Sequence, residues 1–168
     1  MLGYVIHDEA DDPNGRMAAL AAMLATEGWR LAGAVQANLD RGPGCACDMD
    51  LAVLGADVPP IRISQSLGAG AEGCRLDSDA LERAAGLAAG VLNTGADLVI
   101  VNKFGKQEAI GRGFRDLIGG ALAEGVPVLT AVAPDQLPAF EAFAEGLAEK
   151  LDWHRAAAWC RAARSVAA

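Results

Sequence analysis

Largely apolar runs alternate with amphipathic segments along the chain. Four such runs predict buried strands, at residues 2–6, 31–37, 98–101 and 126–132. Apolar residues recur at helical spacing between and after these runs, which predicts helices over residues 16–28, 77–93, 112–124 and 135–151. Strands that alternate with helices in this way are typical of an α/β fold with a mostly parallel sheet.

Shorter segments complete the predicted fold. Residues 49–54 and 61–64 are strand candidates on either side of a turn that holds Gly55 and Pro60, which predicts a small hairpin inserted in the sheet. The Ala-rich residues 153–168 predict a C-terminal helical tail, which either frays or packs on a partner, so that a homodimer through this helix is one interpretation. We find no internal repeat and no linker, and we therefore expect one domain over residues 1–168.

Composition and charge narrow the class of protein. The 168 residues are 52% apolar and 21% charged, which suits one globular domain and excludes a disordered chain. The net charge of −8 argues against a nucleic-acid partner, because such binding depends on Lys and Arg. No apolar run reaches the ~18 residues of a membrane span, and the N-terminal run turns acidic after Ile6 instead of forming a secretory signal. We expect a cytoplasmic protein with no membrane partner and with reduced cysteines.

Three polar loops follow predicted strands, at residues 7–15, 64–75 and 102–112. Ligands of open parallel sheets bind beyond the carboxyl ends of the strands, so chemistry is expected in these loops. The first loop lies where a phosphate-binding loop would lie, but the pattern Gly-x4-Gly-Lys-Ser/Thr is absent. It carries four carboxylates instead, from Asp8, Glu9, Asp11 and Asp12. A solvated acidic loop and a loop that contacts a cation or a base are both consistent with this composition.

The loop at residues 102–112 is the most informative, because it gathers basic and amide side chains in an acidic chain. Lys103 and Lys106 can contact an oxyanion or a phosphate, and Arg112 can do so with two hydrogen bonds. Gly105 lets the backbone approach a ligand. The alternative is an ordinary strand exit in which Glu108 pairs with Arg112 at i, i+4.

The loop at residues 64–75 supplies hydroxyl, amide and guanidinium groups among glycines, and it is either a lid over the same ligand or simply flexible. We therefore hypothesise that a small anionic ligand lies between this loop and the next. Its candidate binding residues are Ser64, Gln65, Arg75, Asn102, Lys103, Gly105, Lys106 and Arg112.

The cysteines offer a different chemistry. Cys45 and Cys47, with Cys74 as a third ligand, are candidates for a thiolate metal site. Structural zinc usually has two or more residues between paired ligands, and here there is one. A redox pair and inert thiols remain the other interpretations.

Two resemblances bear on these motifs. Residues 73–132 resemble the thermophile-type nucleoside triphosphatases of the P-loop class in the order and spacing of their motifs; the matching run is ADLVIVNKFGKQE, residues 96–108. The whole chain is more similar to a bacterial family of unknown function related to that class. The strings that carry this likeness are CDMDL at 47–51, ISQ at 63–65, GCRLD at 73–77 and NKFGKQE at 102–108. Some members of that family are labelled molybdate-transport ATP-binding proteins.

The resemblance implies a three-layer P-loop-NTPase-like fold with a ligand site at the strand ends. Asn102 stands where the triphosphatases have a magnesium-binding Asp, and Lys103 stands where they have an activating Glu. The lysine and Ser/Thr of the phosphate loop are also missing. Because phosphoryl transfer depends on these groups, the resemblance argues against ordinary nucleotide hydrolysis.

Three hypotheses follow. The first is a non-hydrolytic binding or regulatory protein for a nucleotide or a small oxyanion such as molybdate, linked to molybdenum homeostasis. The second is a nucleoside triphosphatase with a rearranged site, in which Glu108 is the base. The third is a metal-binding protein that uses Cys45, Cys47 and Cys74.

Overall fold

The computed structural model describes residues 1–39, 48–65 and 76–167, and its seven strands lie in one sheet in the order β4-β3-β2-β5-β6-β1-β7. The strands are β1 (Leu2–Ile6), β2 (Leu31–Leu39), β3 (Asp48–Val53), β4 (Ile61–Arg62), β5 (Leu98–Phe104), β6 (Val128–Val132) and β7 (Ala148–Lys150). The helices are α1 (Pro13–Thr26), α2 (Ser78–Asn93), α3 (Lys106–Ala109), α4 (Arg115–Ala123), α5 (Leu137–Ala144) and α6 (Trp153–Ala167).

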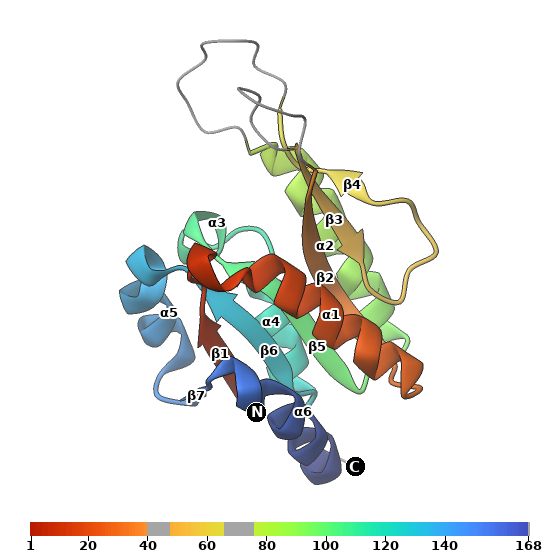
Figure 1. Cartoon of the computed structure of the whole chain (residues 1–168), viewed down its shortest axis with the longest axis vertical. Helices are drawn as coiled ribbons and strands as arrows, with labels where there is room; N and C mark the ends of the chain where they lie inside the picture. The colour runs from red at the N-terminus through yellow and green to blue at the C-terminus, as the bar shows by residue number, and fades with distance from the viewer. Residues whose placement is uncertain (40–47, 66–75, 168) are drawn as a thin grey trace.

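Five of the strands are parallel, and two form an antiparallel hairpin at one edge (Figure 1). β5 and β6 lie at the centre, and every residue of β6 is buried. Such strands are continuous apolar runs because helices cover both of their faces. β3 and β4 extend the sheet beyond β2 by antiparallel pairing. The prediction of an α/β fold with a mostly parallel sheet and a small hairpin is confirmed.

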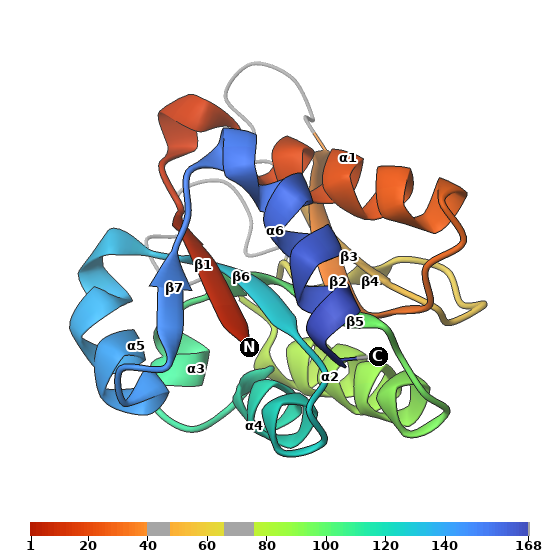
Figure 2. The ribbon, with the colours of Figure 1, turned by 90° about the horizontal axis from the view of Figure 1, so that it is seen from below.

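Helices cover both faces of the sheet, so the fold has three layers (Figure 2). Side chains of α1 and α6, such as Leu24 and Trp159, pack with Leu98 and Ile100 of β5 on one face. On the other face, residues of α2, α4 and α5 pack against Val99 and Val101. Neighbouring residues of β5 therefore contribute to opposite halves of the core, as the two-residue period of a strand requires. This is the three-layer P-loop-NTPase-like arrangement that the resemblance implies.

Helix α1 begins with a tight local cap. Asp12 has a left-handed backbone (φ 48°), which Asp tolerates better than most residues, and its side chain accepts a hydrogen bond from the Gly15 N–H. A Cβ at Gly15 would collide with the Asp12 carboxylate, so this cap requires glycine. Pro13 occupies the first turn, where its missing N–H costs nothing. The β1–α1 connection is thus an acidic cap instead of a glycine-rich phosphate loop.

The predicted helix over residues 135–151 is wrong in its second half. α5 ends at Ala144, because Glu145 and Gly146 both adopt left-handed conformations (φ 49° and 81°). The chain then forms β7, which pairs with β1 in parallel. Leu147 continued the apolar spacing in the sequence, yet its side chain is 76% exposed.

The predicted boundaries around residues 102–112 also differ from the structure. β5 continues beyond the apolar run to Phe104, because that ring is fully buried against Phe140 with centroids 5.2 Å apart. The turn of helix α3 follows at once, so the predicted loop is largely ordered in regular structure. α4 starts at Arg115 instead of residue 112, after Gly111 and Gly113 with positive φ.

No helix in the described part of the chain has both the length and the apolar character that a membrane span needs.

Candidate functional site

A bulge in β5 lies at the carboxyl edge of the sheet. Val101 is opposite Thr130 of β6, but Phe104 is opposite Val132, so three steps along β5 match two along β6. The extra residue falls at Asn102 and Lys103. Bulges re-aim side chains and are over-represented next to functional sites. Here the bulge leaves Asn102 and Phe104 buried and Lys103 exposed.

A cavity of about 370 Å³ opens beside this bulge. It lies between the β2–β3–β4 edge, the end of β5 and the start of α4, on the side of the sheet covered by α2. Its apolar walls are Met49, Leu51, Ile63, Leu76, Leu81 and Phe114. Its polar lining comes from Gln36, Asn102, Lys103, Gly105, Lys106, Gln107, Glu108, Asp135 and Gln136. The volume is in the range of sites for small organic ligands.

Two lysines supply the positive charge of the cavity. Lys103 and Lys106 are both exposed, and neither forms an ion pair with any residue that the structure describes. A carboxylate, Asp135, also borders the cavity, but its side chain accepts a hydrogen bond from Gln136. The two ammonium groups are therefore available to an anion at the rim, where desolvation costs them little.

Glu108 is buried (4% exposed) and shapes the floor of this region. Its carboxylate accepts hydrogen bonds from the Gly105 N–H at 2.9 Å and the Phe114 N–H at 3.1 Å. A Cβ at Gly113, which has a φ of 59°, would collide with this carboxylate. Burial raises the pKa of Glu108, while the backbone N–H donors and the charge of Lys103 act in the opposite direction. Both carboxylate oxygens are thus engaged in holding the turn around α3.

Asn102 joins three elements through its amide. Its Oδ1 accepts a hydrogen bond from the Gln36 N–H of β2 at 2.9 Å. Its Nδ2 donates to Asn14 Oδ1, at the start of α1, at 2.8 Å. The amide supplies both a donor and an acceptor, which a carboxylate at this position would not do. Asn102 therefore joins β5, β2 and α1.

Gln107 lines the same cavity with an unsatisfied amide. Its Oε1 is buried and has no hydrogen-bond partner among the described residues. Buried polar atoms are paired in the great majority of cases, so an unpaired one calls for an explanation. The amide is also not held by any other described residue, so it loses no bond when it turns toward a ligand.

The structure brings together part of the predicted site. Asn102, Lys103, Gly105 and Lys106 all line the cavity. Ser64 is buried and does not line the cavity; its hydroxyl accepts a hydrogen bond from the N–H of Met49, which does, at 3.0 Å. Gln65 is exposed and is not part of the lining.

Arg112 lies elsewhere. It borders a separate hollow together with three carboxylates, from Asp79, Glu82 and Asp116. Its side chain makes no ion pair with a described residue, so the pairing with Glu108 that the spacing allowed is not formed. Arg112 is therefore not placed to share a ligand with Lys103 and Lys106.

The remaining predicted residues, Arg75, Cys45, Cys47 and Cys74, lie outside the described residues. Within the described ranges, no three His, Cys, Asp or Glu side chains gather as a metal site. Cys160 is fully buried on α6, and burial raises the pKa of its thiol to about 12. That thiol is protonated at neutral pH and is inert.

Sequence reasoning missed the far side of the cavity. Gln36, Leu81 and Phe114 come from β2, α2 and the turn before α4, and only the folded sheet places them opposite Lys103. Gln107 stood in the informative loop, but its spacing gave no sign that its amide would be buried without a partner. The apolar walls carried no local signal, since each of these residues also fits a core position.

Comparisons with known proteins identify a family and leave the ligand open. The chain is 39% identical to a protein of Bradyrhizobium diazoefficiens named molybdenum import ATP-binding protein ModC 2, over 147 residues. That match covers 88% of this chain but 16% of the relative, so the chain spans about a sixth of its length. No solved structure matches the chain. The model of a family described as protein of unknown function (DUF2478) matches residues 2–159. The chain therefore belongs to this family of proteins of unknown function.

Proposed function

We propose that the protein is a non-hydrolytic binding or regulatory protein that holds a small anionic ligand, a nucleotide or an oxyanion, in the cavity at the carboxyl end of β5. The observation that carries the proposal is that Lys103 and Lys106, at the rim of a cavity in a chain of net charge −8, form no ion pair with a described residue. Cations beside a cavity attract anions.

The groups around the cavity favour binding over phosphoryl transfer. Asn102 is engaged by Gln36 and Asn14, and Glu108 is engaged by two backbone N–H groups. A general base must reach the proton that it takes, whereas Glu108 is 4% exposed and its two oxygens are turned to the backbone N–H groups of Gly105 and Phe114. The acidic cap at Asp12 would also repel the phosphates of a nucleotide at the start of α1.

The likeness to a molybdenum import ATP-binding protein supports a role in molybdenum homeostasis. A domain that binds an anion and responds to it can report on the supply of a metal that is imported as an oxyanion. In this proposal the ligand is either the molybdate oxyanion or a nucleotide that reflects its use.

A thermal-shift experiment tests the proposal. The protein is melted with GMP, with ATP and with molybdate, and the same series is run on the Lys103→Gln/Lys106→Gln double variant. At least one probe should raise the melting temperature of the wild type, because a ligand that binds only the folded state stabilises it. The double variant should lose that response.

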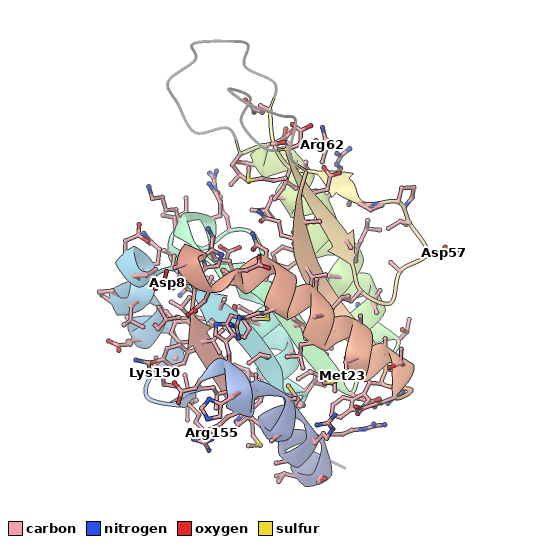
Figure 3. All side chains as sticks on the ribbon, viewed as in Figure 1. Asp8, Met23, Asp57, Arg62, Lys150 and Arg155 are labelled. Carbon is pink, nitrogen blue, oxygen red and sulfur yellow. The ribbon has the colours of Figure 1, made fainter. Side chains whose placement is uncertain are left out.

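Lys150→Gln is the matched control, since Lys150 is the one other lysine of the chain and is exposed on β7. Figure 3 shows it near Arg155 and far from Arg62 of the hairpin. This variant should respond as the wild type does. An equal response of the double variant, or no response of the wild type to any probe, would contradict the proposal.

A further inference from the structure

We infer that the ligand of this cavity is a planar nitrogen heterocycle that carries an anionic group, with its ring against Leu81 and Phe114 and its anion at Lys103 and Lys106. The inference rests on the proposed function and names the class of its ligand. It excludes a bare tetrahedral oxyanion as the ligand that fills the site. Size, wall chemistry and an unpaired amide each point to the same class.

The volume of the cavity is too large for an oxyanion alone. An oxyanion of four oxygens displaces roughly as much as four waters, about 120 Å³ at ~30 Å³ for each water. The cavity holds about 370 Å³, so two thirds of it would stay filled with water. A ring system attached to the anion accounts for the rest of the volume.

The wall chemistry is that of a ring site. Leu81 is 7% exposed and Phe114 is 4% exposed, and Leu51 and Ile63 complete an apolar surface on the α2 side of the cavity. An oxyanion gains nothing from such a surface, whereas an aromatic ring buries its faces there. Sites for small organic ligands combine mostly apolar walls with a few polar groups that fix orientation.

The polar group that fits a heterocycle is the Gln107 amide. Its buried Oε1 has no partner among the described residues, although the side chain borders the cavity. An amide presents an acceptor and a donor side by side, which matches the N–H and ring nitrogen or carbonyl at the edge of a nucleobase-like ring. A ring N–H that reaches Gln107 would give Oε1 a hydrogen-bond donor, and no described residue competes for that oxygen.

The position of the cavity separates it from the phosphate site of the triphosphatases. The cavity lining includes no described residue of the β1–α1 connection, and that connection carries Asp8, Asp11 and Asp12, which repel an anion. The cavity lies instead on the α2 side of the sheet. Asn102, at the end of β5, connects the lining to α1 through Asn14.

Isothermal titration calorimetry with GMP, AMP, guanosine, ribose 5-phosphate and molybdate tests the inference. The tighter of GMP and AMP should bind at least about tenfold more tightly than ribose 5-phosphate and molybdate, a difference of about 1.4 kcal/mol. Gln107→Leu should weaken that nucleotide and leave ribose 5-phosphate unchanged, because only the ring contacts the amide. Lys106→Gln should weaken both, and should leave guanosine unchanged. Lys150→Gln should weaken none of them.

The outcomes separate the two proposals. If molybdate or ribose 5-phosphate binds within tenfold of both nucleotides, the heterocycle is wrong and the anion-binding function stands. If none of the anions binds the wild type, both proposals are wrong. Should Gln107→Leu fail to fold, the comparison of GMP with ribose 5-phosphate on the wild type decides the question alone.

Discussion

The two ends of β5 carry charge in opposite ways. At its amino end, Asp97 accepts hydrogen bonds from the Arg30 backbone N–H at 2.9 Å and the Arg30 guanidinium at 2.8 Å, and Arg164 lies 3.2 Å away. At its carboxyl end, Lys103 and Lys106 have no acidic partner among the described residues. The charged groups at the amino end pair with one another, whereas the lysines at the carboxyl end form no ion pair with a described residue and are exposed to a ligand. A sheet edge with unsatisfied charge beside a cavity is where a ligand is expected.

The pKa values of the carboxylates at the two ends are shifted in opposite directions. Partial burial acts to raise the pKa of Asp97, but its hydrogen bonds from Arg30 and the charge of Arg164 outweigh this, so its pKa lies below the usual value. At the other end, burial of Glu108 outweighs its backbone hydrogen bonds and the charge of Lys103, so its pKa is raised. Paired guanidinium groups therefore stabilise the ionised acid at one end, while burial disfavours the ionised acid at the other.

The largest expected effect is at Glu108. Glu108→Ala removes the acceptor of the Gly105 and Phe114 N–H groups, and both donors stay buried. At about 1–3 kcal/mol for each buried donor left unpaired, the free energy of unfolding should fall by roughly 3 kcal/mol. Urea denaturation measures this loss. Glu108→Gln, which keeps the volume and one acceptor oxygen, should lose less; an equal loss in both variants would contradict a role for the acceptor oxygens.

The same group predicts a pH dependence. Because its folded pKa is raised, the native state holds the Glu108 proton at a pH where the unfolded chain has released it. The stability that this group contributes is present in acid and is lost as the pH rises through the raised pKa. The unfolding free energy of the wild type relative to Glu108→Gln should therefore decline from acid to neutral pH. A difference that grows over this interval would contradict the raised pKa.

A smaller loss is expected at Asn102. Asn102→Ala leaves the Gln36 N–H and the Asn14 side chain without their shared partner, and the unfolding free energy should fall by about 2 kcal/mol. Asn102→Asp separates the two hydrogen bonds of this amide, because a carboxylate accepts from the Gln36 N–H but cannot donate to Asn14 Oδ1. Its loss should be smaller than that of the alanine variant, unless the Asn14 amide turns over and restores the bond. Chemical denaturation of both variants decides the order.

Local sequence patterns predicted some of these features and not others. The apolar runs predicted the strands because buried parallel strands need continuous apolar surface. The helix predicted over residues 77–93 is observed as α2, which Asp77 caps by accepting a hydrogen bond from the Ala80 N–H. Lys103 was recognisable as a site candidate from its place after a buried strand. Local patterns could not show the bulge in β5, because register depends on the neighbouring strand β6.

Glu108 shows the limit most clearly. The sequence offered two roles for Glu108, as the base of a rearranged triphosphatase site or as the i, i+4 partner of Arg112. In the structure its carboxylate instead accepts hydrogen bonds from the Gly105 and Phe114 N–H groups. Leu147 shows the reverse case, since an apolar residue at helical spacing is exposed once Gly146 has ended the helix. The periodicity of apolar residues encodes neither outcome, because each depends on a turn conformation, at Gly113 against the Glu108 carboxylate and at Gly146 before Leu147.

At the amino end of β5, Asp97→Asn should cost about 1 kcal/mol at neutral pH, because the guanidinium of Arg30 is largely exposed and water screens the pair. The lowered pKa fixes the pH dependence: the stability from Asp97 is present above its unfolded value near 3.8 and is lost as the pH falls through the lower folded value. Wild type and variant should converge in unfolding free energy once the pH lies below the folded pKa of Asp97. A constant difference at all pH values would show that ionisation of Asp97 contributes nothing.

The smallest effect on stability is expected where the largest effect on binding is proposed. Lys103→Gln and Lys106→Gln should each change the unfolding free energy by less than about 0.5 kcal/mol, because both are exposed and neither forms an ion pair with a described residue. Thermal melting without ligand measures this. A loss comparable to that of Asn102→Ala would mean that the lysines stabilise the fold, and the contrast between the two ends of β5 would disappear.

The most direct test of the contrast is an NMR titration of nitrogen-15-labelled protein with GMP, followed residue by residue. The account predicts amide shifts that cluster on residues 102–108, on Leu81 and on Phe114, with no change at Arg30, Asp97 or Arg164. Shifts confined to the amino end of β5, or a spectrum that GMP and molybdate both leave unchanged, would contradict the claim that the carboxyl end of β5 is the binding end.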